Sequence, residues 1–177
     1  RRPDVTTGEP PPVLVAPSPL GVLPANFAAV FNSVTRPAFS GLGLLGNALF
    51  FFLIVGPIEE TVKLLAVRLY AYGTDNFEAV VDGAVYGAVA GLGFATIENA
   101  LYIPQNLDAP MATGVGVGLI GAGGNITAIR ALAGPGHVIY SAFAGYYLGL
   151  AKFNRENRGP IVVKGLLVAA LIHATYN

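Results

Sequence analysis

The feature that most constrains this chain is a long apolar run, residues 44–55, followed shortly by two adjacent glutamates, Glu59 and Glu60. An ionised carboxylate at the depth of the hydrocarbon layer costs at least a few kcal/mol, so such acids usually have a function. Glu98, His137 and His173 lie on later apolar segments. We therefore expect these three residues to be the partners of the two acids.

Composition supports a membrane location for this run. The chain has 177 residues, of which 54% are hydrophobic and 11% are charged, and its mean hydropathy is +0.61. Soluble domains carry about 25% charged residues. The sequence therefore predicts an integral membrane protein with an all-α fold, a polytopic bundle of transmembrane helices of about 20 residues each.

Charge and cysteine content exclude several classes of function. The formal net charge is zero and there is no basic run, so nucleic acid is not an expected partner. The chain has no cysteine, which excludes disulfides, thiolate catalysis and zinc–thiolate sites.

The first 40 residues differ from the rest. Residues 1–24 hold seven of the thirteen prolines, which predicts an extended, solvated lead-in without a regular helix. Residues 26–40 are mixed and broken by Pro37, which favours an interfacial or re-entrant segment. We expect a lead-in unit at 1–40 and a transmembrane bundle at 41–177. Because the chain starts without Met and ends just after His173, both ends are expected to be boundaries within a longer protein.

The apolar pattern predicts about five membrane segments. They cover residues 42–72, 77–103, 111–129, 137–153 and 161–177. The first is expected to kink at Gly56-Pro57, and the fourth to begin after Gly134-Pro135-Gly136.

Small residues at helical spacing indicate where these helices pack. Gly83, Gly87 and Gly91 recur every four residues, and this pattern lets membrane helices approach backbone to backbone. Glu98 follows on nearly the same face, so we expect it to point towards another helix. His137 and Ser141 begin a similar row on the fourth segment, continued by Gly145 and Gly149.

The two adjacent acids are expected to have separate roles. On a helix Glu59 and Glu60 point about 100° apart. Lys63 follows Glu59 in the order that favours a helical ion pair. One interpretation is a salt-bridged helix end at the membrane interface. The other is that one acid activates water while the second, steadied by Lys63, orients the site.

The remaining polar residues of the apolar segments fit a metal site. Glu98 could be a neutral hydrogen-bonding member of the bundle, or a metal ligand. His137 and His173 are the two histidines of the chain. Two imidazoles and one carboxylate, with water in the fourth place, form a known catalytic zinc set. Asn177, one turn after His173, could hold the water or an oxyanion.

Other catalytic motifs are missing. The chain has no His-Glu-x-x-His motif, no Gly-x-Ser-x-Gly elbow and no Gly-Lys-Ser/Thr phosphate loop. Ser141 stands four residues after His137, but no third residue is evident to complete a triad.

Four motifs in order resemble the PrsW family of intramembrane metalloproteases, which are relatives of the CAAX prenyl endopeptidases and the bacteriocin-processing membrane proteases. The resemblance covers residues 56–177. Its motifs are Glu59-Glu60-x-x-Lys63, Phe94-x-x-x-Glu98-Asn99-x-x-Tyr102, Pro135-Gly136-His137 leading to Gly145-Tyr146-Tyr147-Leu148-Gly149, and His173-x-x-x-Asn177.

The resemblance implies a multi-pass endopeptidase of the prokaryotic cell membrane that cuts membrane-anchored proteins, anti-sigma factors among them. It also implies that Glu59 and Glu60 are catalytic and that Glu98, His137 and His173 gather at the site. CAAX-type relatives have His where this chain has Glu98, so prenylated substrates are not expected.

The sequence thus supports one specific mechanism and leaves two alternatives. In the mechanism, Glu98, His137 and His173 bind Zn²⁺ or another divalent metal, and Glu59 or Glu60 is the general base for water. In the rival, the same acids and histidines form a relay in a cation or proton transporter. No inverted repeat supports the transporter. A membrane scaffold with buried polar residues is the other alternative.

Overall fold

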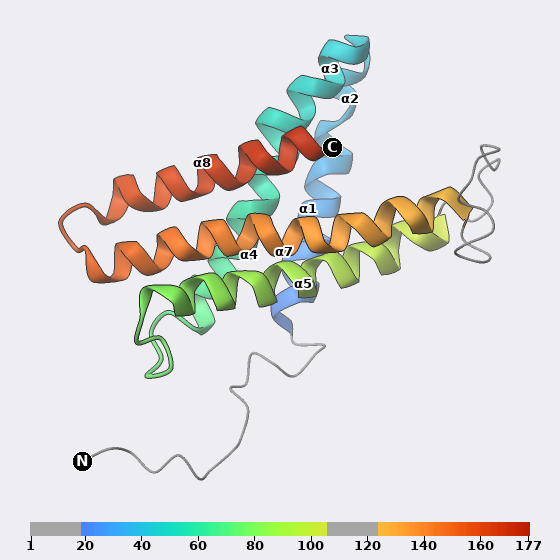
Figure 1. Ribbon diagram of the computed structural model, residues 1–177. Coiled ribbons are helices and arrows are strands. Elements are labelled where there is room, and N and C mark those ends of the chain that lie inside the picture. Colours follow the sequence, from blue (N-terminus) through green and yellow to red (C-terminus); the bar gives the residue numbers. More distant parts are fainter. Residues whose placement is uncertain (1–18, 106–123) are drawn as a thin grey trace, which may run out of the picture.

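The computed structural model describes residues 19–105 and 124–177, and every regular element in these residues is helical (Figure 1). The expected all-α fold is confirmed for this part of the chain. The elements are α1 (Pro19–Thr35), α2 (Pro37–Ser40), α3 (Gly43–Phe50), the π-helix η2 (Phe51–Val55), α4 (Gly56–Tyr70), α5 (Val80–Gln105), α7 (Gly124–Phe153) and α8 (Arg158–Tyr176).

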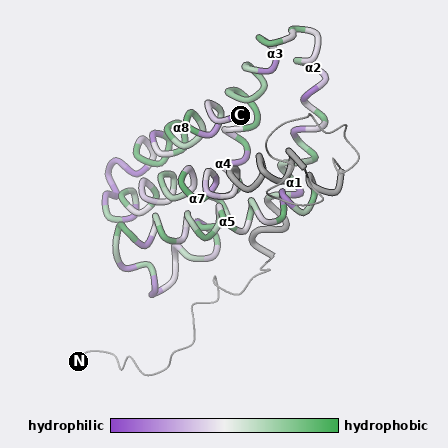
Figure 2. Tube along the Cα trace, turned by 45° about the vertical axis from the view of Figure 1, so that its right-hand side comes forward, coloured by the Kyte–Doolittle hydropathy of each residue, from purple (hydrophilic) through white to green (hydrophobic). Residues whose placement is uncertain are grey.

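Helix α4 has a central place in the bundle. Helices α5, α7 and α8 lie side by side with α7 in the middle, and α1 and α4 cross them (Figures 1 and 2). Helix α4 contacts all three of these helices and also α1. The segment that carries Glu59 and Glu60 is therefore surrounded by partners.

The extended lead-in predicted through residue 24 is wrong from Pro19 onward, because α1 begins there. Pro19 stands in the first turn, where helix N–H groups have no intrahelical partner, and Pro24 gives up a single backbone hydrogen bond. Residues 1–18 lie outside the described residues. Helix α1 contacts α4 and α5, while the division of the chain at residue 40 stays a prediction.

The first predicted membrane helix is present as three consecutive pieces, α3, η2 and α4. The irregularity expected at Gly56-Pro57 takes the form of a π-helical turn, in which the N–H of Gly56 donates to the carbonyl of Phe51. Pro57 has no N–H to donate, so the regular hydrogen-bond ladder cannot run through this point. Single π turns inside α-helices often occur at functional sites.

The glycine row of α5 packs closely against another helix, as predicted, and this helix is α7. Gly83, Gly87 and Gly91 face backbone carbonyls of α7 so closely that a Cβ at any of them would overlap the facing oxygen. For Gly91 that oxygen belongs to His137. This seam brings the two backbones together where α7 carries its histidine.

Helix α7 begins earlier than predicted. Gly134-Pro135-Gly136 was expected to start the helix, but α7 runs from Gly124 and contains Pro135 in its interior. Pro135 leaves one backbone hydrogen bond of α7 unmade, and the close contacts with α5 reach to His137, two residues further on. Residues 124–129 therefore belong to α7 rather than to a separate span at 111–129. Residues 111–123 of that predicted span lie outside the described residues.

Helix α5 begins at Val80, three residues after the predicted start. The carboxylate of Asp82 accepts the backbone N–H groups of Glu78 and Ala79 at 2.8 and 2.7 Å and closes the turn ahead of the helix. Phe77 is instead buried beside Tyr72 in the apolar core. The helix ends at residue 105, two residues after the predicted end at 103, and Pro104 lies in its last turn.

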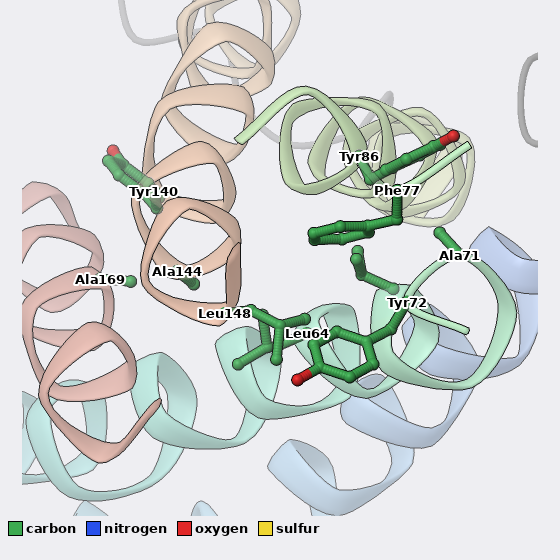
Figure 3. Close-up of a cluster of buried hydrophobic side chains, with 10 residues drawn as sticks. Leu64, Ala71, Tyr72, Phe77, Tyr86, Tyr140, Ala144, Leu148 and Ala169 are labelled. Carbon is green, nitrogen blue, oxygen red and sulfur yellow. The ribbon is translucent and has the colours of Figure 1, made fainter. Parts of the chain in front are cut away.

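The largest apolar cluster joins α4, α5, α7 and α8. In Figure 3, Leu64 of α4 and Leu148 of α7 lie next to Tyr72 from the turn after α4. Lys152 ties this turn to α7, because its Nζ donates to the carbonyls of Tyr72 and Phe77 at 2.7 Å each.

Two of the described helices are long and apolar enough to cross a membrane, Val80–Leu101 and Arg158–Tyr176. About one third of each is buried inside the bundle, and their outward faces expose apolar side chains such as Leu92 and Leu171. Figure 2 shows hydrophobic colours along the helices and hydrophilic ones at the connection between α7 and α8. These features fit a membrane protein. The count of five spans stays a prediction.

Candidate metal centre

The first two turns of α4 supply two acids and one cation to a buried cluster. Glu59, Glu60 and Lys63 have 2%, 0% and 1% of their surface exposed. The helix can approach α8 here because Gly56 has no side chain, and a Cβ would lie 2.6 Å from the carbonyl oxygen of Ala170. Ala170 is one turn before His173, so this contact sets the distance between the acids and that histidine.

Glu60 has partners on both of its carboxylate oxygens. Its Oε1 lies 2.6 Å from Nζ of Lys63 and 2.9 Å from Nδ1 of His173. Its Oε2 accepts a hydrogen bond from Oγ of Ser141 at 3.1 Å. The Lys63 ion pair expected with Glu59 is therefore much closer to Glu60, and Glu60 joins α4 to both α7 and α8.

Glu59 has one engaged oxygen and one open oxygen. Nδ2 of Asn32 donates to Oε1 at 3.0 Å. The other oxygen, Oε2, lies 3.7 Å from Nε2 of His173 and 4.0 Å from Nζ of Lys63. No hydrogen-bond donor among the described residues reaches this buried Oε2. The two acids thus have different surroundings, while their separate roles stay a prediction.

His137 lies between a cation and an acid. Nζ of Lys63 is 2.8 Å from its Nδ1, and Oε2 of Glu98 is 3.0 Å from its Nε2. An ammonium group can only donate, so Nδ1 is the acceptor and Nε2–H donates to Glu98. The ring centroid of His137 lies 4.9 Å from that of His173, which in turn stacks on Tyr140 at 5.0 Å.

Three residues of this cluster fit a metal ion. Glu59, His137 and His173 are all buried, and one potential ligand atom from each lies within 4.8 Å of the others. The open Oε2 of Glu59 is the sort of buried polar atom that a cation would satisfy. Two imidazoles and a carboxylate are also a common donor set for catalytic zinc. The residues present therefore fit a divalent metal.

The structure brings together five of the six predicted site residues. Glu59, Glu60, Glu98, His137 and His173 share one cluster, although the three grouped as potential ligands include Glu59 where Glu98 was predicted. Asn177 is exposed at the end of α8, and its backbone N–H donates to the carbonyl of His173. The roles of all six stay predictions.

Two residues of the cluster were not predicted as members of the site. Ser141 stands in the row of His137, which was noted, but it was considered as a nucleophile rather than as a donor to Glu60. Asn32 lies within a mixed segment that was interpreted as interfacial. Asn32 and Ser33 are the polar residues of the otherwise apolar stretch 27–34, and this was the one available signal for Asn32.

Known proteins resemble this chain over most of its length. Residues 9–177 match the description "PrsW family intramembrane metalloprotease". Protease PrsW of Bacillus subtilis is 34% identical over 137 residues, which cover 75% of this chain and 56% of that protein. Protease PrsW of Halalkalibacterium halodurans is 31% identical over 145 residues, which cover 81% of this chain and 60% of that protein.

Protease PrsW of Geobacillus kaustophilus is 32% identical, and the matched part covers 49% of its length. The chain therefore spans between about half and three fifths of the length of these curated relatives. No solved structure matches the chain. The family match covers nearly all of the sequence and includes every residue of the buried cluster. The chain therefore belongs to the PrsW family of intramembrane metalloproteases.

Proposed function

We propose that this chain is the catalytic part of a multi-pass bacterial membrane endopeptidase that hydrolyses membrane-anchored proteins. Its family membership supports a membrane protease. The observation that carries the proposal is the convergence of Glu59, His137 and His173, each with a ligand atom within 4.8 Å of the others, beside a buried Glu59 oxygen that no donor among the described residues reaches. These three residues would hold a divalent cation, and zinc is the expected one.

Two further acids orient the histidines in this proposal. Glu60 contacts Nδ1 of His173 and leaves Nε2 directed towards Glu59. Glu98 contacts Nε2 of His137, whose Nδ1 faces the Lys63 ammonium at 2.8 Å, so ligation through Nδ1 would require Lys63 to give up this contact. Carboxylates that hold the second nitrogen of a ligating imidazole fix its tautomer and raise its basicity. We therefore assign the third ligand position to Glu59, and an orienting role to Glu98 in place of the predicted ligation.

The chain's own groups divide the remaining work. A divalent cation held there supplies Lewis-acid activation of water and of a peptide carbonyl. Of the two acids predicted as general base, Glu60 has both oxygens engaged, so its role is to hold His173 and Lys63. The oxygen of Glu59 that no donor among the described residues engages is assigned to the cation, so the general base is not assigned to either acid. For Asn177 we retain the proposed role of oxyanion donor, since it follows His173 by one turn.

The substrate is proposed from the class of the enzyme. Two of the helices that supply the cluster, α5 and α8, are long and apolar enough to cross a membrane. A site among such helices would act on a polypeptide that enters the membrane. Membrane-anchored proteins, with anti-sigma factors as one class, meet this requirement.

The test combines metal content with cleavage. Wild type, His173→Ala, Glu59→Gln and Glu98→Gln are purified in detergent, and zinc is measured by mass spectrometry. Cleavage is followed in proteoliposomes with a fluorescently labelled single-span membrane protein as the probe. We expect about one zinc per wild-type chain, loss of zinc and cleavage in His173→Ala and Glu59→Gln, and weakened but measurable zinc in Glu98→Gln.

Glu78→Gln, at an exposed acid in the turn before α5, is the matched control and should behave as wild type. Zinc retained in Glu59→Gln but lost in Glu98→Gln would overturn the ligand assignment and favour Glu98 as the third ligand. A folded wild type that binds no divalent metal and cuts no probe would overturn the proposed function.

A further inference from the structure

We propose that Asn32 of α1 is a positioning residue that aims the Glu59 carboxylate at the two histidines. The inference rests on the proposed function, because it concerns how Glu59 meets the cation. Asn32 has 8% of its surface exposed, and its Nδ2 donates to Oε1 of Glu59 at 3.0 Å. The two residues are 27 positions apart, so this contact depends on how α1 packs against α4.

Small side chains let α1 come close enough for this contact. Ala25 and Ala28 are 2% and 1% exposed and pack against Phe94 of α5. Ala25, Ala28 and Asn32 are spaced by three and four residues, so they share one face of α1. The short amide side chain of Asn32 therefore reaches Glu59 from a helix that lies close against α4 and α5.

The hydrogen bond decides which oxygen of Glu59 is available. With Oε1 held by Asn32, Oε2 is directed towards Nε2 of His173 at 3.7 Å, and no donor among the described residues engages it. The Asn32 amide is neutral, so it fixes the carboxylate without compensating its negative charge. The nearest positive charge to Oε2 in the described residues is the Lys63 ammonium, at 4.0 Å.

The surroundings of Asn32 argue against a purely structural role. Its Oδ1 is buried, and no donor among the described residues reaches it. Buried polar side chains that serve packing alone are usually satisfied on all their groups. The contact with Glu59 is the one hydrogen bond recorded for this side chain in the described part of the chain. Burial of the amide is therefore explained by what it does to Glu59.

The experiment separates positioning from packing with two variants. Asn32→Leu removes the amide and keeps a side chain of similar volume, whereas Asn32→Ala removes both. Asn26→Ala, at an exposed position of the same helix, is the matched control. The purified full chain is titrated with Zn²⁺ against a chelating dye, and Co²⁺ is then bound so that its visible spectrum reports the coordination geometry.

We expect both Asn32 variants to bind Zn²⁺ about 10- to 100-fold more weakly than wild type, with an altered Co²⁺ spectrum, and Asn26→Ala to match wild type. Asn32→Leu with wild-type affinity and spectrum would overturn the role of Asn32 while the proposed metal site stands. A wild type without Zn²⁺ binding would instead overturn the metal site itself, and the role of Asn32 with it. If Asn32→Ala fails to fold, Asn32→Leu still decides between these outcomes.

Discussion

At the scale of single residues, the buried ammonium of Lys63 links the polar groups of the cluster. Its Nζ lies 2.6 Å from Glu60, 2.8 Å from His137 and 4.0 Å from Glu59, and 4.3 Å from the centre of the Phe94 ring. Two acids and one lysine are thus enclosed with almost no exposure to solvent. Removal of one charge from such a group leaves the others buried without compensation.

We therefore predict that Lys63→Met destabilises the metal-free protein by about 3–5 kcal/mol, because Glu60 loses its closest positive partner. The measurement is the free energy of unfolding in mixed detergent micelles, with a chelator present. Circular dichroism at increasing denaturant concentration gives this value for wild type and variant.

Two comparisons identify the cause of that loss. Lys164→Met, at an exposed lysine of α8, should change the free energy of unfolding by less than about 0.5 kcal/mol. The double variant Lys63→Met/Glu60→Gln should recover part of the loss, since the acid closest to Lys63 is then neutral as well. A Lys63→Met protein as stable as wild type would show that the buried pair contributes nothing to stability.

At the scale of helices, close backbone contacts set the geometry of the cluster. Gly56 of α4 lies against Ala170 of α8, and Gly91 of α5 lies against His137 of α7. The first contact is three residues before Glu59 and the second involves a histidine of the cluster. The small residues therefore position the polar groups as well as pack the helices.

The contact at Gly56 yields the second prediction. Gly56→Ala would place a Cβ 2.6 Å from the carbonyl oxygen of Ala170, so α8 must move away from α4 and carry His173 away from Glu60. We expect a loss of stability of about 1–3 kcal/mol and weaker Zn²⁺ binding. Gly159→Ala is the matched control on α8, because its Cβ meets open space, and it should be neutral or slightly stabilising. Equal stability and metal affinity for the two variants would refute this argument.

Helix spacing explains which parts of the fold and site could be predicted from the sequence. The glycine row ending near Glu98, and the row that starts at His137, assigned one packed face to each helix. Both faces meet in the structure, and Glu98 contacts His137. Periodicity determines a face because it follows from the geometry of one helix.

Contacts between distant helices could not be predicted in the same way. Asn32 reaches Glu59 across 27 residues, and Ser141 reaches Glu60 across 81. Such pairs depend on the crossing of two helices, which spacing within either helix does not determine. The start of α7 was also missed, since Gly134-Pro135-Gly136 was expected to begin the helix, whereas α7 runs from Gly124 with Pro135 in its interior.

At the scale of the whole molecule, the cluster is assembled from every large helix of the described bundle. Asn32 comes from α1, Glu59 from α4, Glu98 from α5, His137 from α7 and His173 from α8. No helix alone carries two of the three proposed ligands. A cation bound to these ligands would therefore bind the folded bundle and not the unfolded chain, and its binding free energy would add to the stability of the fold.

This linkage gives the last prediction. Zinc at about 100 times its Kd should stabilise the wild-type bundle by about 2.7 kcal/mol, which corresponds to a rise in Tm of about 5–10 °C for a chain of this size. Differential scanning fluorimetry in detergent measures the shift in Tm. Mg²⁺, which prefers oxygen ligands, serves as the control cation. Glu59→Gln should lose the zinc shift, because the bound cation would lose one ligand from α4. An equal zinc shift in wild type and Glu59→Gln would mean that the stabilising cation binds elsewhere, and the link between the site and the assembled bundle would fail.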